Sequence, residues 1–325
     1  MSKIALIFFI GFELCYYLLI AQTGIVEYFS SDIVLIAPLP IGGIIGSILS
    51  YKIKTKDEIK IRVFLVIQLL MTLFYPNYNA IGLFILGISV GALAPLIINE
   101  LKKASMVELG FALCLSYSVG TLLFNYEPAK REYIAILFTL IVLLASFYLP
   151  KNPKKIKESS LASHSFLVMV LWIFLDSALF ETLSRDLTVS IWRGGFTLEI
   201  VAFHILGVIL AFKINLQKVE NELFIIILFA LSYLFYFLRE PLLLSIVYPF
   251  VISYYNVNIL KTLRNIPLCK LSIYMIVIGW LASGAGLFVA LEDLILFVPI
   301  IFCTVIIQVL YTQKNIQSKE KKCIN

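Results

Sequence analysis

The sequence predicts an all-α polytopic membrane protein of about twelve transmembrane helices, arranged as two parallel six-helix bundles. Three observations lead there: an apolar composition, a regular alternation of basic loops, and an internal repeat. Of the 325 residues 61% are hydrophobic and 14% are charged, with a mean hydropathy of +0.98. An average soluble domain carries about 25% charged residues. A chain this apolar therefore needs lipid as a second solvent.

The same composition argues against several classes of function. The net charge of +6 does not indicate nucleic-acid binding, because the basic residues form short clusters between apolar runs, where they orient helices. The five cysteines show no metal or disulfide spacing, and we expect no metal and no cofactor. Residues 3–24 are interrupted by Glu13 and followed at once by further apolar runs. We interpret them as a first membrane helix rather than a cleaved signal peptide.

The membrane helices follow from length, since about 20 mostly apolar residues are needed to cross a hydrocarbon core of about 30 Å. Charged residues, Pro-Asn pairs and glycine clusters mark the boundaries. The predicted segments are 3–24, 32–51, 61–79, 80–99, 104–124, 132–150, 164–183, 194–213, 221–238, 240–258, 270–291 and 293–312.

The distribution of lysine and arginine predicts the orientation, because short cytoplasmic loops carry the excess of these residues. With the N-terminus inside, 21 of the 26 basic residues fall on the inner side. Adding or removing one segment would destroy that alternation. We therefore expect both termini in the cytoplasm of a multi-pass protein of the cell membrane, the inner membrane of a bacterium.

The clearest internal repeat links the second and eighth segments. Residues 44–54 read IIGSILSYKIK and residues 205–215 read ILGVILAFKIN, with six of eleven positions identical at an offset of 161. The match pairs Gly46 with Gly207.

Two further echoes appear in the same order along the chain. FFIGFELCYY in the first segment matches LWIFLDSALF in the seventh at an offset of 163, which pairs Glu13 with Asp176. Pro95 of the fourth segment pairs with Pro249 of the tenth. Agreement of three ordered pairs indicates a duplication rather than chance similarity between apolar runs.

The repeat is parallel, because Lys52 and Lys213 both end their helices on the basic side. Two halves of this kind are related by an axis along the membrane normal. The predicted organisation is an N-terminal bundle at 1–150, a cytoplasmic linker at 151–163, a C-terminal bundle at 164–312 and a basic cytoplasmic tail at 313–325.

These features resemble the major facilitator superfamily. The family carries, after its second helix, a glycine, an acidic residue four positions later and then basic residues. Here Gly46 is followed by Ser50 and then Lys52, so the acidic position has lost its charge. The resemblance implies a secondary transporter that moves a small solute by alternating access. We further expect a monomer in the lipid bilayer that couples this movement to protons. It also implies that the first and seventh helices line a central cavity.

Glu13 and Asp176 are the strongest candidates for functional residues inside the membrane. Both lie near the middle of a predicted segment, where a charged side chain costs roughly 2.5–3.5 kcal/mol to insert. Carboxyl groups that exchange protons with a cavity would suit a proton-coupled carrier. The plainer alternative is that each makes a structural contact between helices.

His204, midway along the eighth segment, is a candidate proton relay, although a lone histidine in a bundle is more often a hydrogen-bonded packing residue. A further set is predicted to serve helix packing and gating, because small residues allow close approach and prolines interrupt helices. This set is Gly46, Lys52, Gly207, Lys213, Pro95 and Pro249.

Two other classes of function stay open at this point. A structural or assembly subunit of a membrane complex fits the composition, but it does not require paired carboxyl groups at repeated positions. An intramembrane enzyme is disfavoured, because the sequence has only two histidines and none of the common hydrolase, zinc or nucleotide motifs.

Overall fold

The computed structural model describes residues 2–29, 32–150, 161, 163–302, 304 and 307. Within these ranges every regular element is helical. The predicted linker at 151–163 falls almost wholly outside the described residues, and the tail at 313–325 falls entirely outside them.

Within the part of the chain that the structure describes, eight helical spans are long and apolar enough to cross a membrane, which makes the chain a multi-pass membrane protein. Two of them contain a turn of π-helix. The spans are α1 (Ser2–Tyr16) continued by η1 (Tyr17–Gln22) and α2 (Thr23–Tyr28); α3 (Ile33–Ile36) with α4 (Pro38–Lys52); α6 (Ala80–Glu100) with η2 (Leu101–Lys103); α7 (Met106–Phe124); α9 (Ser163–Arg185); α11 (Lys218–Phe237); α12 (Pro241–Leu263); and α13 (Leu268–Met275) continued by η4 (Ile276–Ala282) and α14 (Ser283–Leu291).

Three more helices, each shorter than 18 residues, lie where spans are predicted: α5 (Asp57–Thr72), α8 (Glu132–Ser146) and α10 (Thr197–Lys213). The last predicted segment, 293–312, contains η5 (Leu294–Phe297) and continues as helix from residue 298 to residue 302; of its remaining residues the structure describes 304 and 307. Each of the first eleven predicted segments therefore contains a helix, and a count of twelve crossing helices stays a prediction.

Side-chain caps fix where several helices begin. Ser105 and Glu108 form a reciprocal capping box at the start of α7. Asn79 accepts a hydrogen bond from the backbone N–H of Gly82 at 2.7 Å, at the start of α6. Such caps satisfy backbone N–H groups that have no partner inside the helix. The short breaks that contain them therefore separate helices that an apolar sequence would otherwise run together.

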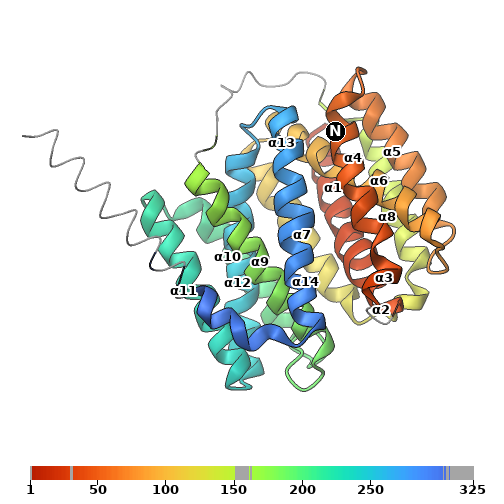
Figure 1. Cartoon of the computed structure of the whole chain (residues 1–325). Coiled ribbons are helices and arrows are strands. Elements are labelled where there is room, and N and C mark those ends of the chain that lie inside the picture. Colours follow the sequence, from red (N-terminus) through yellow and green to blue (C-terminus); the bar gives the residue numbers. More distant parts are fainter. Residues whose placement is uncertain are drawn as a thin grey trace, which may run out of the picture.

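The packing of helices follows the internal repeat. In the earlier part of the chain α4 packs on α6, α1 on α7, and α5 on α6; in the later part α10 packs on α12, α9 on α14, and α11 on α12. In Figure 1 the helices coloured red to yellow gather on one side and those coloured green to blue on the other. The two sides meet where α7 contacts α10 and where α13 contacts α4 and α6.

Gly46 and Gly207 occupy corresponding places in this pattern. A Cβ atom on Gly46 would lie 2.0 Å from the Ile88 carbonyl oxygen of α6, and one on Gly207 would lie 2.5 Å from the Phe250 carbonyl oxygen of α12. Both glycines thus permit backbone-to-backbone contact.

The two prolines do not correspond in the same way. Gly46 lies over Ile88, two turns before Pro95, whereas Gly207 lies over Phe250, directly after Pro249. Measured from these glycines, Pro95 and Pro249 lie at different heights in their helices, so pairing them through the repeat is wrong by about two turns. In this apolar chain, proline spacing was too weak a signal to fix the register.

Lys52 and Lys213 lie in the last turns of α4 and α10, at the same end of the molecule. Contacts tie that end together: Ser50 of α4 hydrogen-bonds Ser272 of α13 at 2.7 Å, and Lys261 of α12 donates to the Ala211 carbonyl oxygen of α10. We call this the basic end, and the opposite one, with the loops at 125–131 and 186–196, the far end.

Candidate functional site

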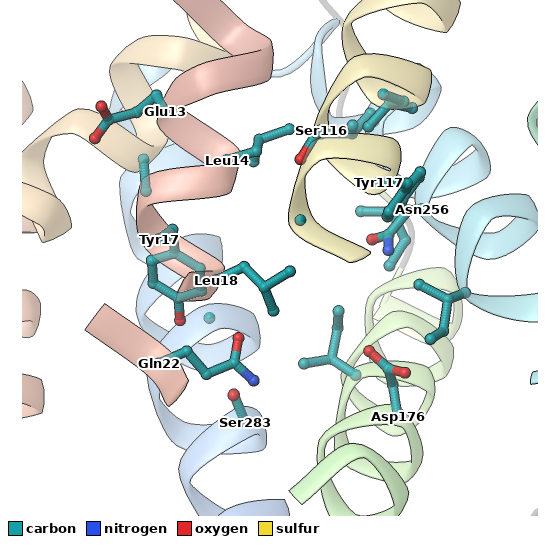
Figure 2. A pocket seen from close by; sticks show the side chains of 18 of the residues that line it. Glu13, Leu14, Tyr17, Leu18, Gln22, Ser116, Tyr117, Asp176, Asn256 and Ser283 are labelled. Atoms are coloured by element: carbon teal, nitrogen blue, oxygen red, sulfur yellow. The ribbon is translucent and has the colours of Figure 1, made fainter. Parts of the chain in front are cut away.

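A cavity of about 310 Å³ lies between the two sides of the molecule. Most of its lining is apolar, with side chains from α1, α6, α7, α9, α12 and the π-helical turns. The polar and aromatic lining residues, several of which Figure 2 shows, are Glu13, Tyr17, Gln22, Ser116, Tyr117, Thr121, Phe124, Asp176, Ser177, Phe180, Trp192, His204, Tyr255, Asn256, Trp280 and Ser283.

Asp176 lies on α9 and is partly exposed to this cavity. Two phenol groups of α12 donate to its carboxylate: Tyr248 to Oδ1 at 2.8 Å and Tyr255 to Oδ2 at 2.5 Å. Hydrogen bonds to both oxygens hold the carboxylate in one orientation and supply part of the solvation it loses on burial.

Glu13 lines the same cavity from α1, but it is only 3% exposed. In Figure 2 its carboxylate points away from the other labelled residues. Its Oε2 atom accepts a hydrogen bond from Gln68 Nε2 of α5 at 3.1 Å, and Gln68 also reaches Thr139 of α8 at 3.5 Å. Glu13 and Asp176 therefore border one cavity while their hydrogen-bond partners differ.

His204 is the third predicted residue that reaches the cavity. It is 4% exposed; its Nδ1 atom lies 2.7 Å from Ser253 Oγ, and its ring stacks on Tyr117 with centroids 4.4 Å apart. A ring held on its face and at one nitrogen fits the packing alternative, and the relay role stays a prediction.

The six predicted packing residues lie outside the lining: Gly46, Lys52, Pro95, Gly207, Lys213 and Pro249. The glycines act at helix contacts, and the lysines end α4 and α10.

The two π-helical turns bring aromatic residues to the cavity. Tyr17 on η1 and Trp280 on η4 meet edge to face, with ring centroids 6.5 Å apart. A Cβ on Gly43 would lie 2.1 Å from the Trp280 ring, so this glycine makes the space that the indole fills. Short π-helical segments are frequent at functional sites. No proline or glycine pattern in the sequence reveals them.

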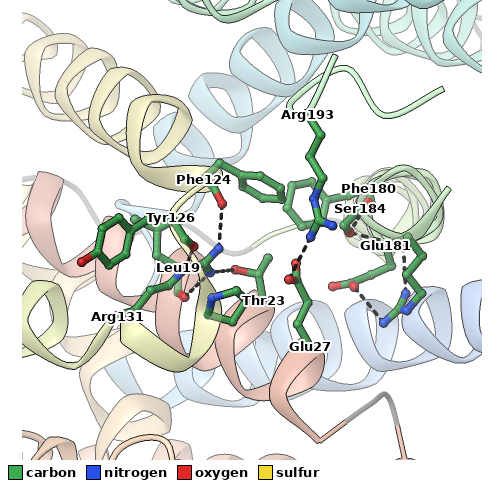
Figure 3. Close-up of polar contacts among 12 residues, drawn as sticks. Leu19, Thr23, Glu27, Phe124, Tyr126, Arg131, Phe180, Glu181, Ser184 and Arg193 are labelled. Atoms are coloured by element: carbon green, nitrogen blue, oxygen red, sulfur yellow. Dashed lines mark hydrogen bonds and ion pairs between the residues drawn. The ribbon is translucent and has the colours of Figure 1, made fainter. Parts of the chain in front are cut away.

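The far end of the cavity is closed by contacts between the two sides of the molecule (Figure 3). Arg193 pairs with Glu27 at 2.9 Å, and Asn125 Nδ2 donates to the Trp192 carbonyl oxygen at 2.8 Å. Beneath them Trp192 packs on Phe124 and Phe180, with ring centroids 5.1 and 4.8 Å away. The lining continues instead toward the basic end, to Leu101, Leu260 and Leu263.

Glu181 is a buried acidic residue that the sequence reasoning missed. It is 3% exposed on α9, one turn beyond Ser177, and accepts a hydrogen bond from Gln22 Nε2 at 3.2 Å. Arg185, one turn further on, lies 3.4 Å from its carboxylate. The signal was available, because Glu181 falls inside the predicted segment 164–183.

Arg131 lies at the end of the loop before α8, where a basic side chain is usually solvated, yet it is fully buried. Its guanidinium donates to the carbonyl oxygens of Leu19, Phe124 and Tyr126 at 2.7–2.9 Å and to Thr23 Oγ1 at 2.9 Å. The π-helical turn explains one of these contacts, because the Thr23 N–H bonds Leu18 instead of Leu19. Burial lowers the pKa of Arg131, while Glu27 acts in the opposite direction.

Comparison with known proteins identifies the fold. No protein-family model matches the chain, and no curated protein matches it in sequence. Among solved structures, the human organic anion transporter MFSD10 (TETRAN) is similar with a TM-score of 0.59 and 14% identity, covering 89% of this chain and 92% of that one. The major facilitator superfamily transporter FucP, in the outward conformation, is similar with a TM-score of 0.58 and 15% identity, covering 92% and 98%. The chain therefore has the fold of major facilitator superfamily transporters.

Proposed function

We propose that the protein is a secondary active transporter that moves a small solute by alternating access and couples this movement to protons. The observation that carries the proposal is the cavity of about 310 Å³ between the two sides of the molecule, with Asp176 partly exposed to it. Because one chain forms the whole cavity, we propose a monomer as the functional unit. The predicted bundles at 1–150 and 164–312 are the two bodies that would move.

Alternating access requires contacts between the two sides that can break and re-form at each end. The far-end contacts suit this requirement, because one is a partly exposed ion pair between Glu27 and Arg193 and another is a single hydrogen bond from Asn125. At the basic end the Ser50–Ser272 hydrogen bond also crosses between the sides. Because the cavity lining continues toward the basic end, we propose that the structure is an inward-facing state, with that end in the cytoplasm.

Proton coupling rests on the two carboxyl groups at the cavity. Moving a bare charge through a closed and dry intermediate is costly, so a carboxyl group that takes up a proton before closure lowers the barrier. Asp176 is the better placed of the two, because it faces the cavity. Glu13 would contribute to proton coupling by way of the hydrogen bond that it accepts from Gln68 of α5.

Alternating access is tested by distances between spin labels, which needs no known substrate. One label pair bridges the two sides at the far end, on exposed Val34 and Leu187; a second bridges them at the basic end, on exposed Lys54 and Lys270. We expect two populations for each pair, with the far-end distance increasing as the basic-end distance decreases when pH is changed. A pair within one side, on Leu73 and Tyr133, should not move. Fixed distances for both bridging pairs, at every pH and with every added solute, would favour a structural subunit.

Coupling is tested by Asp176→Asn and Glu13→Gln, which keep shape while removing the titratable group. A carrier coupled through these residues loses the pH response of the label distances in at least one variant, while the two populations persist. An unchanged pH response in the double variant would assign the carboxyl groups a structural role and leave His204 as the candidate for proton coupling.

A further inference from the structure

We propose that the cavity selects a monovalent organic cation with an apolar body, and that Asp176 is its counter-ion. This inference rests on the proposed transport function and names the substrate class of the same site. It draws on the charges around the cavity, the hydrogen bonds of Asp176 and the aromatic rings near it.

The charges at the cavity wall are of one sign. Glu13 and Asp176 line it, whereas none of the residues that line the described cavity is a lysine or an arginine. His204 is buried, hydrogen-bonded at Nδ1 and stacked on Tyr117. The nearby Arg131 is directed at backbone carbonyl oxygens instead. An anionic solute would meet no cation here, while a cationic one would meet a carboxylate.

Asp176 is oriented in advance to receive a cation. Tyr248 and Tyr255 each donate to a different carboxylate oxygen. A carboxylate has about four acceptor positions, so positions are left on the side that faces the cavity. Glu13 is almost fully buried and turned toward Gln68. One available carboxylate matches one positive charge, which is why the cation is monovalent.

The aromatic lining suits the body of such a cation. Tyr17 and Trp280 form one wall, and Tyr117 and Trp192 also border the space. Cations are attracted to the faces of aromatic rings, and quaternary ammonium groups are recognised in this way. The rest of the lining is mostly apolar, and a volume of about 310 Å³ fits a small organic molecule.

The first test uses unmodified protein and three soluble benzyl compounds of similar size. They are the cation benzyltrimethylammonium, the neutral N-benzylacetamide and the anion benzylsulfonate. Binding to purified protein in detergent is followed by calorimetry and by tryptophan fluorescence, because two of the three tryptophans line the cavity. We expect the cation to bind at least tenfold more tightly than the neutral compound, and the anion not to bind. Equal affinity for the cation and the neutral compound, tighter binding of the anion, or no binding of the cation would overturn the proposal.

The second test uses variants. Asp176→Asn should weaken benzyltrimethylammonium binding at least tenfold and leave N-benzylacetamide unchanged. The exposed Glu240, at the start of α12, provides a control: Glu240→Gln changes the net charge equally and should leave both affinities unchanged. Unaltered cation binding in Asp176→Asn would contradict the assignment. If that variant does not fold, the affinities of the three compounds for the unmodified protein test the proposal. Trp280→Leu provides a second variant, which we expect to weaken binding of the cation more than binding of the neutral compound.

The label distances described above separate this inference from the transport function. Opposite movements at the two ends without cation binding would support the proposed transport function and overturn the proposed substrate class. Selective cation binding with fixed distances at both ends would retain the binding site and overturn the carrier.

Discussion

Arg193 Nη2 lies 2.9 Å from Glu27 Oε2, and this ion pair joins the end of the first membrane helix to the loop before α10. The two residues are 166 positions apart in the chain. Their side chains are 37% and 18% exposed, so water screens much of their attraction. An ion pair of this kind contributes about 0.2–1 kcal/mol, enough, in the carrier that we propose, to shift the equilibrium between a closed and an open far end without locking it.

We expect Arg193→Glu to open the far end more often, by about two- to fivefold, because it replaces that weak attraction with repulsion. The measurement is the alkylation rate of a cysteine placed at Thr121, which lines the cavity, by an impermeant maleimide in a background without the native cysteines. The exchanged pair Glu27→Arg with Arg193→Glu should restore the original rate. An alkylation rate equal in all three proteins would show that the pair does not hold this end closed.

Arg131→Met should lower the free energy of unfolding by about 3–5 kcal/mol, because it leaves several buried oxygens without a donor. The neighbouring Lys130 is the matched control: its exposed side chain pairs with the exposed Glu127 at 2.6 Å, so we expect Lys130→Met to leave stability nearly unchanged. Thermal unfolding in detergent measures both. Equal melting temperatures for the two variants would mean that the Arg131 hydrogen bonds add no stability.

Gly46→Ala should separate α4 from α6 and destabilise the protein by about 1–3 kcal/mol, because its Cβ would lie 2.0 Å from a backbone oxygen that no side-chain rotation can move. Gly284→Ala is the comparison, since nothing lies within 4 Å of the added carbon. There we expect stability unchanged or raised by up to about 1 kcal/mol, from the helix propensity of alanine. If both substitutions changed the free energy of unfolding equally, the close contact between α4 and α6 at Gly46 would not contribute to stability.

The orientation is predicted to place the basic end in the cytoplasm, on the strength of the lysine and arginine distribution. Reporter domains fused after Lys52, Lys157 and Lys322 should report cytoplasm, and one fused near Asn77 should report the outside. A fusion after Lys157 that reports the outside would contradict the arrangement of six helices on each side of residues 151–163.

Much of the helical layout could be predicted because it is set by local features. Apolar runs interrupted by charges locate the helices, and the repeat around Gly46 and Gly207 correctly indicates two equivalent helix contacts. The cavity also collects Glu13, Asp176 and His204 as a group. These features follow from the cost of placing polar groups in lipid, which acts on each segment separately.

The surroundings of those residues could not be predicted, because they depend on how separate helices pack. Nothing near Asp176 in the chain indicates that Tyr248 and Tyr255, more than 70 residues later, donate to it. Likewise Glu13 turns toward Gln68 rather than the cavity because α5 offers an amide there. The sequence places Arg131 in a loop, and it does not show that the π-helical turn leaves the Leu19 carbonyl oxygen free to accept a hydrogen bond from its guanidinium.

The turn of π-helix at Tyr17–Gln22 also bears on how the two halves of the sequence are aligned. Glu13 and Asp176 match at an offset of 163, but Gly46 and Gly207 match at 161, so the first half holds two more residues between its matched positions. A π-helical turn closes over five residues instead of four, and η1 lies inside that interval, whereas α9 is regular helix from Ser163 to Arg185. One of the two additional residues is thus accommodated as an insertion within a membrane helix. Any residue-by-residue superposition of the duplicated halves must open its gap there, at the cavity wall beside Tyr17, and not only in the loop that follows.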